Sequence, residues 1–518
     1  MKRKLKQVMA AMLCCILCGC SAAQNNTKAE ITAAAEKMPL LSIVTADGKT
    51  DFAEKPVSEL VSSQIATWTP GYVMPPAPYY EDCRITLSDG SGTVVVDSAE
   101  AQVKVRGNWT TNYEKKPLRI KFTEQQSLLG LNGGASFKNW VLLAEYKDAS
   151  MLRNKTALEI SREIMGQDGL YASDAAFVEV NINEKYWGVY LLAELQQINE
   201  NRMDITEAQK DYKGTDIGYL LEFDGNFYNE EPLQQFYVDY HDNAALKPYD
   251  GNDGSGKTIR CLPLMKSERK KEVGFTIKSD IYSQEQHDFI ASYVNNVYRI
   301  MYEAAYNDKA YVFNGDYSEI SETTEISPKE AVEKVVNVRS LADMYIISEL
   351  TCDADLYWSS FFMTADFGEG GDRKLTFQAP WDFDSALGNK SRCPDGKGYY
   401  AANIIPDVNS NEYETINPWL AVLSYEDWYC DIIREKWTQL YDSGVFEKAC
   451  QTISADKSRY SEAFARNIEK WGMTTKNSEV NGELSEEAKS CSTQAEAADF
   501  LEKWLRSRVE FMNSCWHS

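Results

Sequence analysis

The sequence predicts an α+β fold, because segments with strand periodicity come first and segments with helix periodicity come later. Over residues 84–109, apolar and polar residues alternate around Asp-Gly and Ser-Gly turn signals, which is typical of antiparallel strands. Residues 283–306 and 497–516 instead repeat apolar residues at helical spacing. We therefore expect a strand-rich part followed by a mainly helical part.

Two further elements are predicted within the first 200 residues. Residues 148–165 are expected to form a helix, since apolar residues recur every seven positions on one face and Asp148 or Ser150 can cap its start. Residues 177–194 are expected to form a hairpin that turns near residue 183, since apolar residues alternate before the turn and an aromatic strand returns after it. The order is therefore several strands, one helix and two strands.

The N-terminus indicates export and lipid attachment. Residues 1–19 begin with four basic residues and continue with an apolar run that is too short to span a bilayer as a mature helix, as in a signal peptide. The run leads into Leu-Cys-Gly-Cys, which resembles a bacterial lipobox, so Cys20 is the expected lipidation site. Residues 20–38 are expected to be a flexible tether, and residues 39–76 a lead-in segment. We expect the protein on the outer face of the cytoplasmic membrane.

Composition excludes several classes of function. The 518-residue chain has a net charge of −24, whereas a nucleic-acid-binding protein needs a basic face. Only three histidines occur, and none lies in a catalytic pattern, which argues against a serine hydrolase and a histidine-ligated metal site. The cysteines beyond Cys20 form no C-x-x-C pair, so a zinc site is not indicated. Their scattered spacing fits disulfides or buried free thiols equally well.

Two motifs imitate nucleotide-binding sequences. Residues 251–258 match the phosphate-loop pattern, but no buried strand precedes them and Pro263 interrupts the next segment, so a surface turn is expected. The triplet at residues 366–368 imitates the metal-binding Asp-Phe-Gly of protein kinases. It lies in a glycine-rich run between two predicted strands, so we expect the tip of a hairpin there.

Two aspartates, Asp382 and Asp384, lie in the apolar run "APWDFDSALGN". Buried carboxylates are costly unless they are paired or bound to a metal. If the run is extended, both side chains lie on one face, where they repel each other unless a cation lies between them. The pattern indicates a divalent-metal site. The alternative is a strand end whose aspartates cap backbone amides or pair with arginine.

The segment before this run strengthens the metal interpretation. A helix is predicted over residues 340–350, opened by a capping box of Ser340 and Asp343. A loop with Asp355 and Ser360 follows, and then a strand, a turn and a second strand. Protein kinases place the catalytic base, a metal ligand five residues later, a hairpin and the metal-binding aspartate in this order. Asp355 is therefore the candidate base.

Several stretches, in the same order, resemble the CotH kinase family, which has an atypical protein-kinase-like fold. They include "VKVRGNW", "KNWVLLAEYKDASMLRNKTALEI", "GYLLEFDG" and "PWDFDSALGN". The resemblance implies a bilobal fold with a strand-rich N-lobe at residues 77–198. It implies a mainly helical C-lobe at residues 199–518, with a loop insertion around residues 225–275.

The resemblance also implies roles for individual residues. Asp355 is the expected base, and Asp382 and Asp384 are the expected metal ligands. Ser360 is a further expected metal-site residue; it stands where typical kinases have asparagine, which weakens one metal contact or hands it to water. The remaining candidates belong to the nucleotide site. Arg106 and Gly107 are expected to cover the phosphates. Lys121 is the first candidate, and Lys116 the second, for the lysine that neutralises the α/β phosphates, and Glu159 or Glu194 is the expected partner of that lysine.

The implied activity is ATP-dependent phosphorylation, with Mg²⁺ or Mn²⁺, of Ser or Thr in an envelope or secreted protein. Two alternatives stay open. The first is a catalytically silent surface scaffold with the same fold, which Ser360 favours. The second is a metal-dependent hydrolase of a glycan or phosphoester, which would use the same carboxylates with water as the nucleophile.

Overall fold

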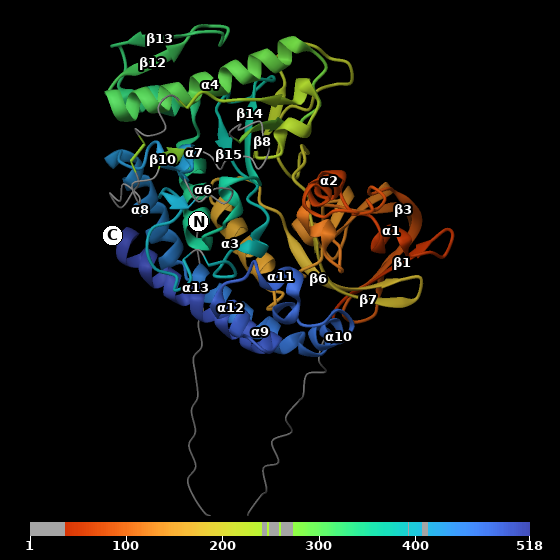
Figure 1. Ribbon diagram of the computed structural model, residues 1–518. Helices are drawn as coiled ribbons and strands as arrows, with labels where there is room; N and C mark the ends of the chain where they lie inside the picture. Colours follow the sequence, from red (N-terminus) through yellow and green to blue (C-terminus); the bar gives the residue numbers. More distant parts are fainter. Residues whose placement is uncertain (1–36, 241–245, 248–257, 261–272, 392, 407–412) are drawn as a thin grey trace, which may run out of the picture. The chain divides into compact units, whose positions relative to one another are not determined.

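The computed structural model describes residues 37–240, 246–247, 258–260, 273–391, 393–406 and 413–518 (Figure 1). They belong to one unit, Lys37–Ser518. The predicted signal peptide, Cys20 and nearly all of the predicted tether lie outside these residues. No helix within the described ranges has the length and apolar character needed to cross a membrane. The chain combines strands and helices, so the α+β class is confirmed.

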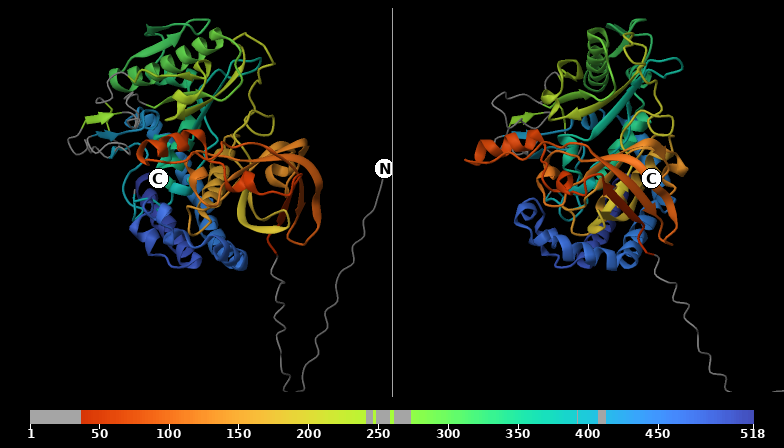
Figure 2. Two further views of the ribbon diagram at one scale, coloured as in Figure 1. Left: turned by 45° about the vertical axis from the view of Figure 1, so that its right-hand side comes forward. Right: turned by 90° about the vertical axis from the view of Figure 1, so that its right-hand side faces the viewer.

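The first part of the chain is a closed seven-stranded barrel with strand order β1-β2-β3-β4-β5-β7-β6. The strands in the red-to-yellow segment close on themselves in the views of Figures 1 and 2. Alternate residues fill the barrel, such as Ile85 and Leu87 on β2 and Val103 and Val105 on β3. The strands are β1 (Leu40–Thr45), β2 (Glu81–Ser88), β3 (Val94–Val105), β4 (Leu118–Gln126), β5 (Phe137–Leu143), β6 (Ala175–Ile182) and β7 (Lys185–Ala193).

The barrel begins earlier than the predicted N-lobe. The expected lead-in segment contributes β1, which pairs antiparallel with β2 and parallel with β6. Leu41 and Ile43 of this strand point into the core. Two short helices, α1 (Asp51–Glu54) and α2 (Glu59–Trp68), then lead to β2. A sheet closed by β1 leaves no unpaired strand edge, which explains why the chain uses a strand that lies so far from the others in sequence.

The predicted hairpin and helix between the barrel strands both form. The hairpin is β6 and β7, and its turn residues Asn183 and Glu184 have positive φ. The helix is α3 (Arg153–Gly166), which begins five residues later than expected. The Asp148 carboxylate accepts hydrogen bonds from the backbone N–H groups of Leu152 (3.0 Å) and Arg153 (2.8 Å). Asp148 therefore caps the helix from outside its first turn.

The second part is not only helical, because a five-stranded sheet of order β15-β14-β8-β11-β9 lies within it. The sheet strands are β8 (Gly218–Asp224), β9 (Gln235–Phe236), β11 (Gly274–Ile277), β14 (Phe361–Asp366) and β15 (Thr376–Phe377). Short pairs join β12 (Ala310–Phe313) to β13 (Ile320–Thr323), and β17 (Tyr413–Thr415) to β10 (Thr258–Arg260) and β16 (Ile405–Pro406).

The helices of this part pack around one large apolar core. They are α4 (Gln284–Asn307), α5 (Pro328–Val335), α6 (Val338–Thr351), α7 (Pro418–Ala421), α8 (Asp427–Asp442), α9 (Val445–Arg459), α10 (Ser461–Trp471), α11 (Ser478–Asn481), α12 (Glu486–Ser490) and α13 (Gln494–Trp516). Helix α6 is buried along its length and contacts α3, α8 and α13. This packing fixes the loop that comes after α6.

The capping box predicted for α6 is wrong. The helix begins at Val338, and the Asn337 side chain caps it by accepting the Ser340 N–H at 3.2 Å. Asp343 is fully buried, and its carboxylate lies 2.6 Å from the Lys436 ammonium of α8. Asp343 is free for that pairing because the helix starts before Ser340.

The two imitation motifs have different outcomes. Residues 251–257 and much of the predicted insertion lie outside the described residues. The triplet at residues 366–368 lies at the turn between the antiparallel strands β14 and β15, so the hairpin is confirmed. The Asp366 carboxylate accepts hydrogen bonds from the backbone N–H groups of Thr206 (3.1 Å) and Gly368 (2.9 Å). Asp366 therefore holds the turn.

Candidate active site

The loop after α6 carries the first carboxylate of the site. The helix ends at Cys352, which adopts a left-handed conformation (φ 48°), and Asp355 opens a short 3-10 helix, Asp355–Tyr357. The backbone N–H of Asp355 donates to the Asp353 carboxylate at 3.0 Å. This internal bond fixes the loop and leaves the Asp355 side chain free to point away from it.

A turn, and not an extended strand, presents the other two carboxylates. Strand β15 ends at Phe377, and Asp382 has φ 69° and ψ 59°. The run that contains Asp382 and Asp384 is therefore not extended, as the two-residue period had assumed. A 3-10 helix, Phe383–Ser385, comes next. The Asn154 side chain of α3 accepts the Phe383 N–H at 2.8 Å and holds this turn. A non-glycine residue in the left-handed region is strained, and such strain often marks a functional site.

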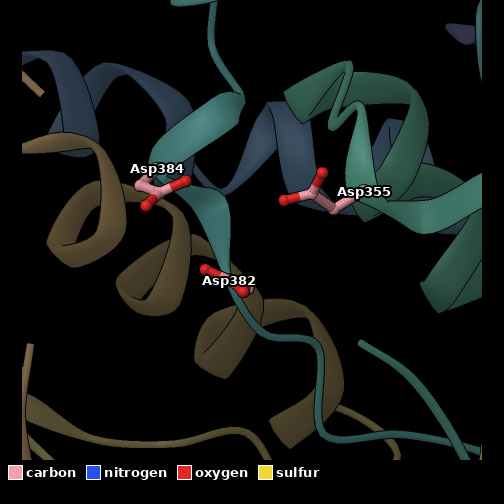
Figure 3. A group of neighbouring side chains, drawn as sticks. All are labelled: Asp355, Asp382 and Asp384. Atoms are coloured by element: carbon pink, nitrogen blue, oxygen red, sulfur yellow. The ribbon is translucent and has the colours of Figure 1, made fainter. Parts of the chain in front are cut away.

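Asp355, Asp382 and Asp384 come together in space. One carboxylate oxygen from each lies within 4.8 Å of those of the other two. Figure 3 shows the three groups facing a common space, two from the segment after β15 and one from the segment after α6. Among the described residues, no hydrogen bond or ion pair joins a protein donor to the carboxylate of Asp355 or Asp382. Two of the three groups therefore lack a protein counter-charge in direct contact.

Lys147 is the cation in direct contact with this cluster. Its ammonium lies 3.1 Å from Asp384 and 3.6 Å from Glu483, and it also donates to the Ser385 hydroxyl. Burial works against the charged form, but Asp384 and Asp355 raise the pKa of Lys147 well above its usual value. Lys147 is therefore a charged, buried lysine held at the cluster.

Negative charge exceeds positive charge around the cluster. Asp353 is a fourth aspartate, and burial together with the Asp355 carboxylate raises its pKa well above the usual range. Arg106 lies with its guanidinium 5.9 Å from the centre of the Trp381 ring. Burial lowers the pKa of Arg106, and the Asp382 carboxylate opposes that shift. Four aspartates thus share this region with two cationic side chains.

This arrangement fits a divalent cation. Mg²⁺ and Mn²⁺ prefer carboxylate oxygens, and neighbouring carboxylates are stabilised when a cation lies between them. The Asp382 and Asp384 oxygens supply part of a coordination sphere, the Asp355 oxygen lies within 4.8 Å of them, and Mg²⁺ normally completes its sphere with water and substrate phosphates. The donor set therefore suits a divalent cation that keeps part of its coordination sphere for other ligands.

The electrostatics predict an unusual pH dependence of stability. Burial and the nearby Asp384 and Asp355 carboxylates raise the pKa of Asp382 to about 7. An unfolded aspartate titrates near pH ~4, so the folded state holds the proton more tightly. Without metal, the free energy of unfolding should fall as the pH rises from about 4 through about 7. Urea unfolding in EDTA would measure this.

The matched variant for that experiment is Asp382→Asn, which keeps the shape of the side chain and removes its charge. In this variant the free energy of unfolding should decrease less between pH 4 and 8, and the melting temperature at pH 8 should be higher than that of the parent chain by about 2 °C or more. Added Mg²⁺ should stabilise the parent chain at pH 8 and have little effect on the variant. A parent chain whose stability is level from pH 4 to 8 would contradict the prediction.

The structure places Arg106, Gly107 and Ser360 in turns near the cluster. Arg106 and Gly107 come directly after β3, and Gly107 has φ 94°, with the Thr110 hydroxyl 2.6 Å from where a Cβ would lie. Only glycine fits this turn. Ser360 also has positive φ (61°), and its backbone N–H donates to Glu222 of β8 at 3.1 Å. Their functional roles stay predictions.

The predicted lysines lie elsewhere in the barrel part. Lys121 is exposed on β4, between Ile120 and Phe122, which both point into the barrel. Lys116 is buried, and its ammonium donates to the backbone carbonyls of Thr111 (2.5 Å) and Tyr113 (2.9 Å). Neither lysine forms a hydrogen bond or ion pair with the three aspartates within the part of the chain that the structure describes.

The two candidate glutamates pair with other cations. Glu159 on α3 lies 2.5 Å from the Lys155 ammonium. Glu194, after β7, lies 3.0 Å from Arg202 and accepts a hydrogen bond from Asn132 at 2.9 Å. The structure does not join either glutamate to Lys116, Lys121 or Lys147 among the described residues.

Sequence reasoning missed Lys147 and Asp353. Asn389 links Lys147 to the cluster, since its amide donates to the backbone carbonyls of Lys147 (3.2 Å) and Asp384 (2.7 Å). The signal available for Lys147 is that it lies within a stretch that resembles the CotH kinase family, directly before Asp148. The burial of every residue from Lys147 to Asn154 is known only from the structure. A lysine in so buried a run needs a partner of opposite charge.

Comparison with known proteins agrees with the geometry. The family model described as "CotH kinase protein" matches residues 103–512, which include all three clustered aspartates. The chain is also similar to the inner spore coat protein H of Bacillus subtilis (strain 168), with 30% identity over 128 residues. That match covers 25% of this chain and 31% of the spore coat protein, so the similarity spans less than a third of that relative. On the extent of the family match, the chain belongs to the CotH kinase family.

Proposed function

We propose that this protein is a CotH-like protein kinase that transfers the γ-phosphate of ATP to a Ser or Thr hydroxyl of a protein. The observation that carries the proposal is the meeting of Asp355, Asp382 and Asp384, from two separate loops, within 4.8 Å. Phosphoryl transfer needs few covalent partners and mainly needs positioned charges, which such a cluster provides. Membership of the CotH kinase family supports the same interpretation. We propose as well that the barrel part and the mainly helical part are the two lobes of a kinase-like fold.

Asp355 is the residue proposed to accept the proton of the substrate hydroxyl. Its carboxylate is partly buried and unpaired among the described residues, and its backbone is fixed by Asp353. A base of this kind must keep a free oxygen within hydrogen-bonding reach of the hydroxyl that attacks. Buried helix α6 anchors the loop that holds it.

Asp382 and Asp384 are the residues proposed to hold Mg²⁺ or Mn²⁺. The bound cation would neutralise phosphate oxygens and so stabilise charge during the transfer. Lys147 reaches Asp384 from the loop after β5 and supplies a second positive charge at the same place. Arg106, next to Trp381, is the proposed contact for the outer phosphates, together with the Gly107 turn.

The cellular setting is part of the proposal. Lipid attachment at Cys20 would hold the kinase on the outer face of the membrane, where an envelope or secreted protein would be the substrate. The direct test uses residues 37–518, since this unit is compact and Met38 is part of its core. The chain is incubated with labelled ATP and Mg²⁺ or Mn²⁺, with itself and with an envelope extract as acceptors.

Each outcome of that assay separates the alternatives. Labelled protein, acid-stable as phosphoserine or phosphothreonine, is the expected result. Nucleotide binding without any transfer would support a silent scaffold. Release of inorganic phosphate or sugar without labelled protein would support a metal-dependent hydrolase and would overturn the kinase proposal.

Lys147 gives a sharper test of how phosphates are bound. Lys147→Met keeps the apolar stem and removes the charge. We expect kcat/KM for ATP to fall about 10- to 100-fold, because the proposed hydrogen bond from Lys147 to a phosphate is one to a charged group, which contributes about 1.5–3 kcal/mol. Lys121→Met tests the lysine that the sequence suggested, and we expect a change of less than about twofold for a solvated charge.

The neutral control is Lys138→Met, since Lys138 is exposed on β5 of the same barrel. Steady-state kinetics with varied ATP, together with a melting curve for each variant, separate lost binding from lost folding. A larger effect of Lys121→Met than of Lys147→Met would restore the strand lysine as the phosphate ligand.

A further inference from the structure

Two cysteines flank the segment that carries the three aspartates. Cys352 ends helix α6 and is fully buried, and Cys393 lies beyond the turn that contains Asp384 and is half-buried. The two side chains interact electrostatically, although 41 positions separate them in sequence. Both residues have positive φ, 48° and 60°, so the backbone at each is turned in a way that L-residues rarely adopt.

A single buried arginine joins the two thiols. Arg508 of α13 lies with Nη1 3.6 Å from the Cys393 sulfur. Its Nε (2.9 Å) and Nη2 (2.6 Å) donate to the backbone carbonyl of Glu349, and the Cys352 thiol donates to the same carbonyl at 3.4 Å. The guanidinium and the Glu349 carbonyl therefore hold both sulfurs in one small volume.

The two thiols differ in reactivity. The neighbouring Cys352 side chain lowers the pKa of Cys393, and the Arg508 charge acts in the same direction. Burial raises the pKa of Cys352 well above its usual value. A thiolate is the species that attacks a disulfide, and it must be reachable. Cys393 is thus suited to react first, and Cys352 to complete the bond.

We propose that Cys352 and Cys393 form a reversible disulfide that closes the segment carrying Asp355, Asp382 and Asp384. The bond would join the end of α6 to the chain beyond Asp384 and so tie the two loops of the candidate active site together. Formation of this bond does not depend on the proposed kinase activity. It goes beyond that activity because it assigns an oxidised and a reduced form to the protein.

The oxidant is the disulfide of an exported thiol oxidoreductase or of a small thiol. The Cys393 thiolate attacks one sulfur of that disulfide and releases the other as a thiol, which leaves a mixed disulfide on Cys393. Cys352 then attacks the Cys393 sulfur and releases the second thiol. Two cysteine thiols are oxidised, one external disulfide is reduced to two thiols, and both protons go to the released thiols.

The test uses residues 37–518 treated with oxidised glutathione or with dithiothreitol. After blocking of free thiols and digestion, the oxidised sample should contain the peptides of Cys352 and Cys393 joined, two hydrogens lighter than their sum. Dithiothreitol should remove this species. The melting temperature should rise by about 5 °C on oxidation, because the bond closes a loop of some forty residues.

Variants decide whether this pair is responsible. Cys393→Ser and Cys352→Ala should each abolish the linked peptide and the shift in melting temperature. Cys515→Ser, which removes a half-buried thiol on α13, and Cys450→Ala, which removes a buried thiol on α9, should leave both unchanged. Cys393→Ser keeps the proposal testable if the buried Cys352→Ala variant fails to fold.

Two results would overturn the proposal. One is full alkylation of both cysteines in folded, glutathione-treated protein. The other is a glutathione adduct on Cys393 that never resolves to the internal bond. Both results are read from peptide masses and not from kinase activity. The disulfide can therefore be present in a protein without kinase activity, or absent from an active kinase, so the two proposals can fail separately.

Discussion

Asp355→Asn is expected to abolish phosphoryl transfer and to leave nucleotide binding intact. The substitution keeps the size of the side chain and removes its ability to take a proton. A positioned base contributes roughly 10²- to 10⁴-fold to a transfer rate, so kcat should fall by about that factor. The apparent affinity for MgATP, measured from the stabilisation of the folded chain, should change by less than about twofold, because the proposed metal ligands Asp382 and Asp384 remain.

Asp366→Asn is the matched control for this prediction. Asp366 belongs to the triplet that imitates the kinase metal motif, but its carboxylate holds the turn after β14. Its substitution should leave the transfer rate unchanged. A fully active Asp355→Asn variant would remove the proposed base, whereas a variant that loses both transfer and nucleotide binding would place Asp355 among the metal ligands.

Asp382→Asn and Asp384→Asn are expected to remove the metal-dependent part of nucleotide binding. With ligand at about 100 times its Kd, binding should stabilise the parent chain by about 2.7 kcal/mol. Each variant should lose most of this stabilisation in the presence of Mg²⁺ or Mn²⁺. Thermal unfolding with metal alone, with ATP and EDTA, and with both together measures each contribution separately.

The two variants should also differ from each other. Asp384→Asn removes the nearer ion-pair partner of Lys147 and leaves Glu483 as its ion-pair partner among the described residues, so the metal-free protein should become less stable. Asp382→Asn removes an unpaired charge, so the metal-free protein should become more stable near pH 8. Equal stabilisation of both variants and the parent by MgATP would show that the nucleotide site lies elsewhere.

The three aspartates that cluster could be predicted because their signals are local. Asp382 and Asp384 stand out as acidic residues in an apolar run, and Asp355 stands out by its place after a clear helix. The geometry that unites them could not be predicted in the same way. The two-residue period presupposes an extended strand, whereas Asp382 lies in a left-handed turn held by Asn154, which is 228 positions away.

Lys121 carries a sequence signal against a role in the site. It stands between two apolar residues of β4 that point into the barrel, so the two-residue period of a strand places it on the outer face. That period alone argues against contact with a buried phosphate site. Lys147 could be suspected only from its place beside Asp148 in the family-like stretch, and its partner could not be predicted, because 237 positions separate it from Asp384.

The sequence by itself determined the α+β class, the hairpin at residues 177–194, the helix capped by Asp148 and the three acidic residues of the candidate site. These features depend on periodicity and on neighbours within a few positions, which a single chain displays directly. Only the tertiary structure decided that β1 closes a barrel, that Lys147 faces Asp384 and that Cys352 and Cys393 lie around Glu349 and Arg508. Those pairings join residues far apart in sequence, and packing and charge select them only once the whole chain has folded.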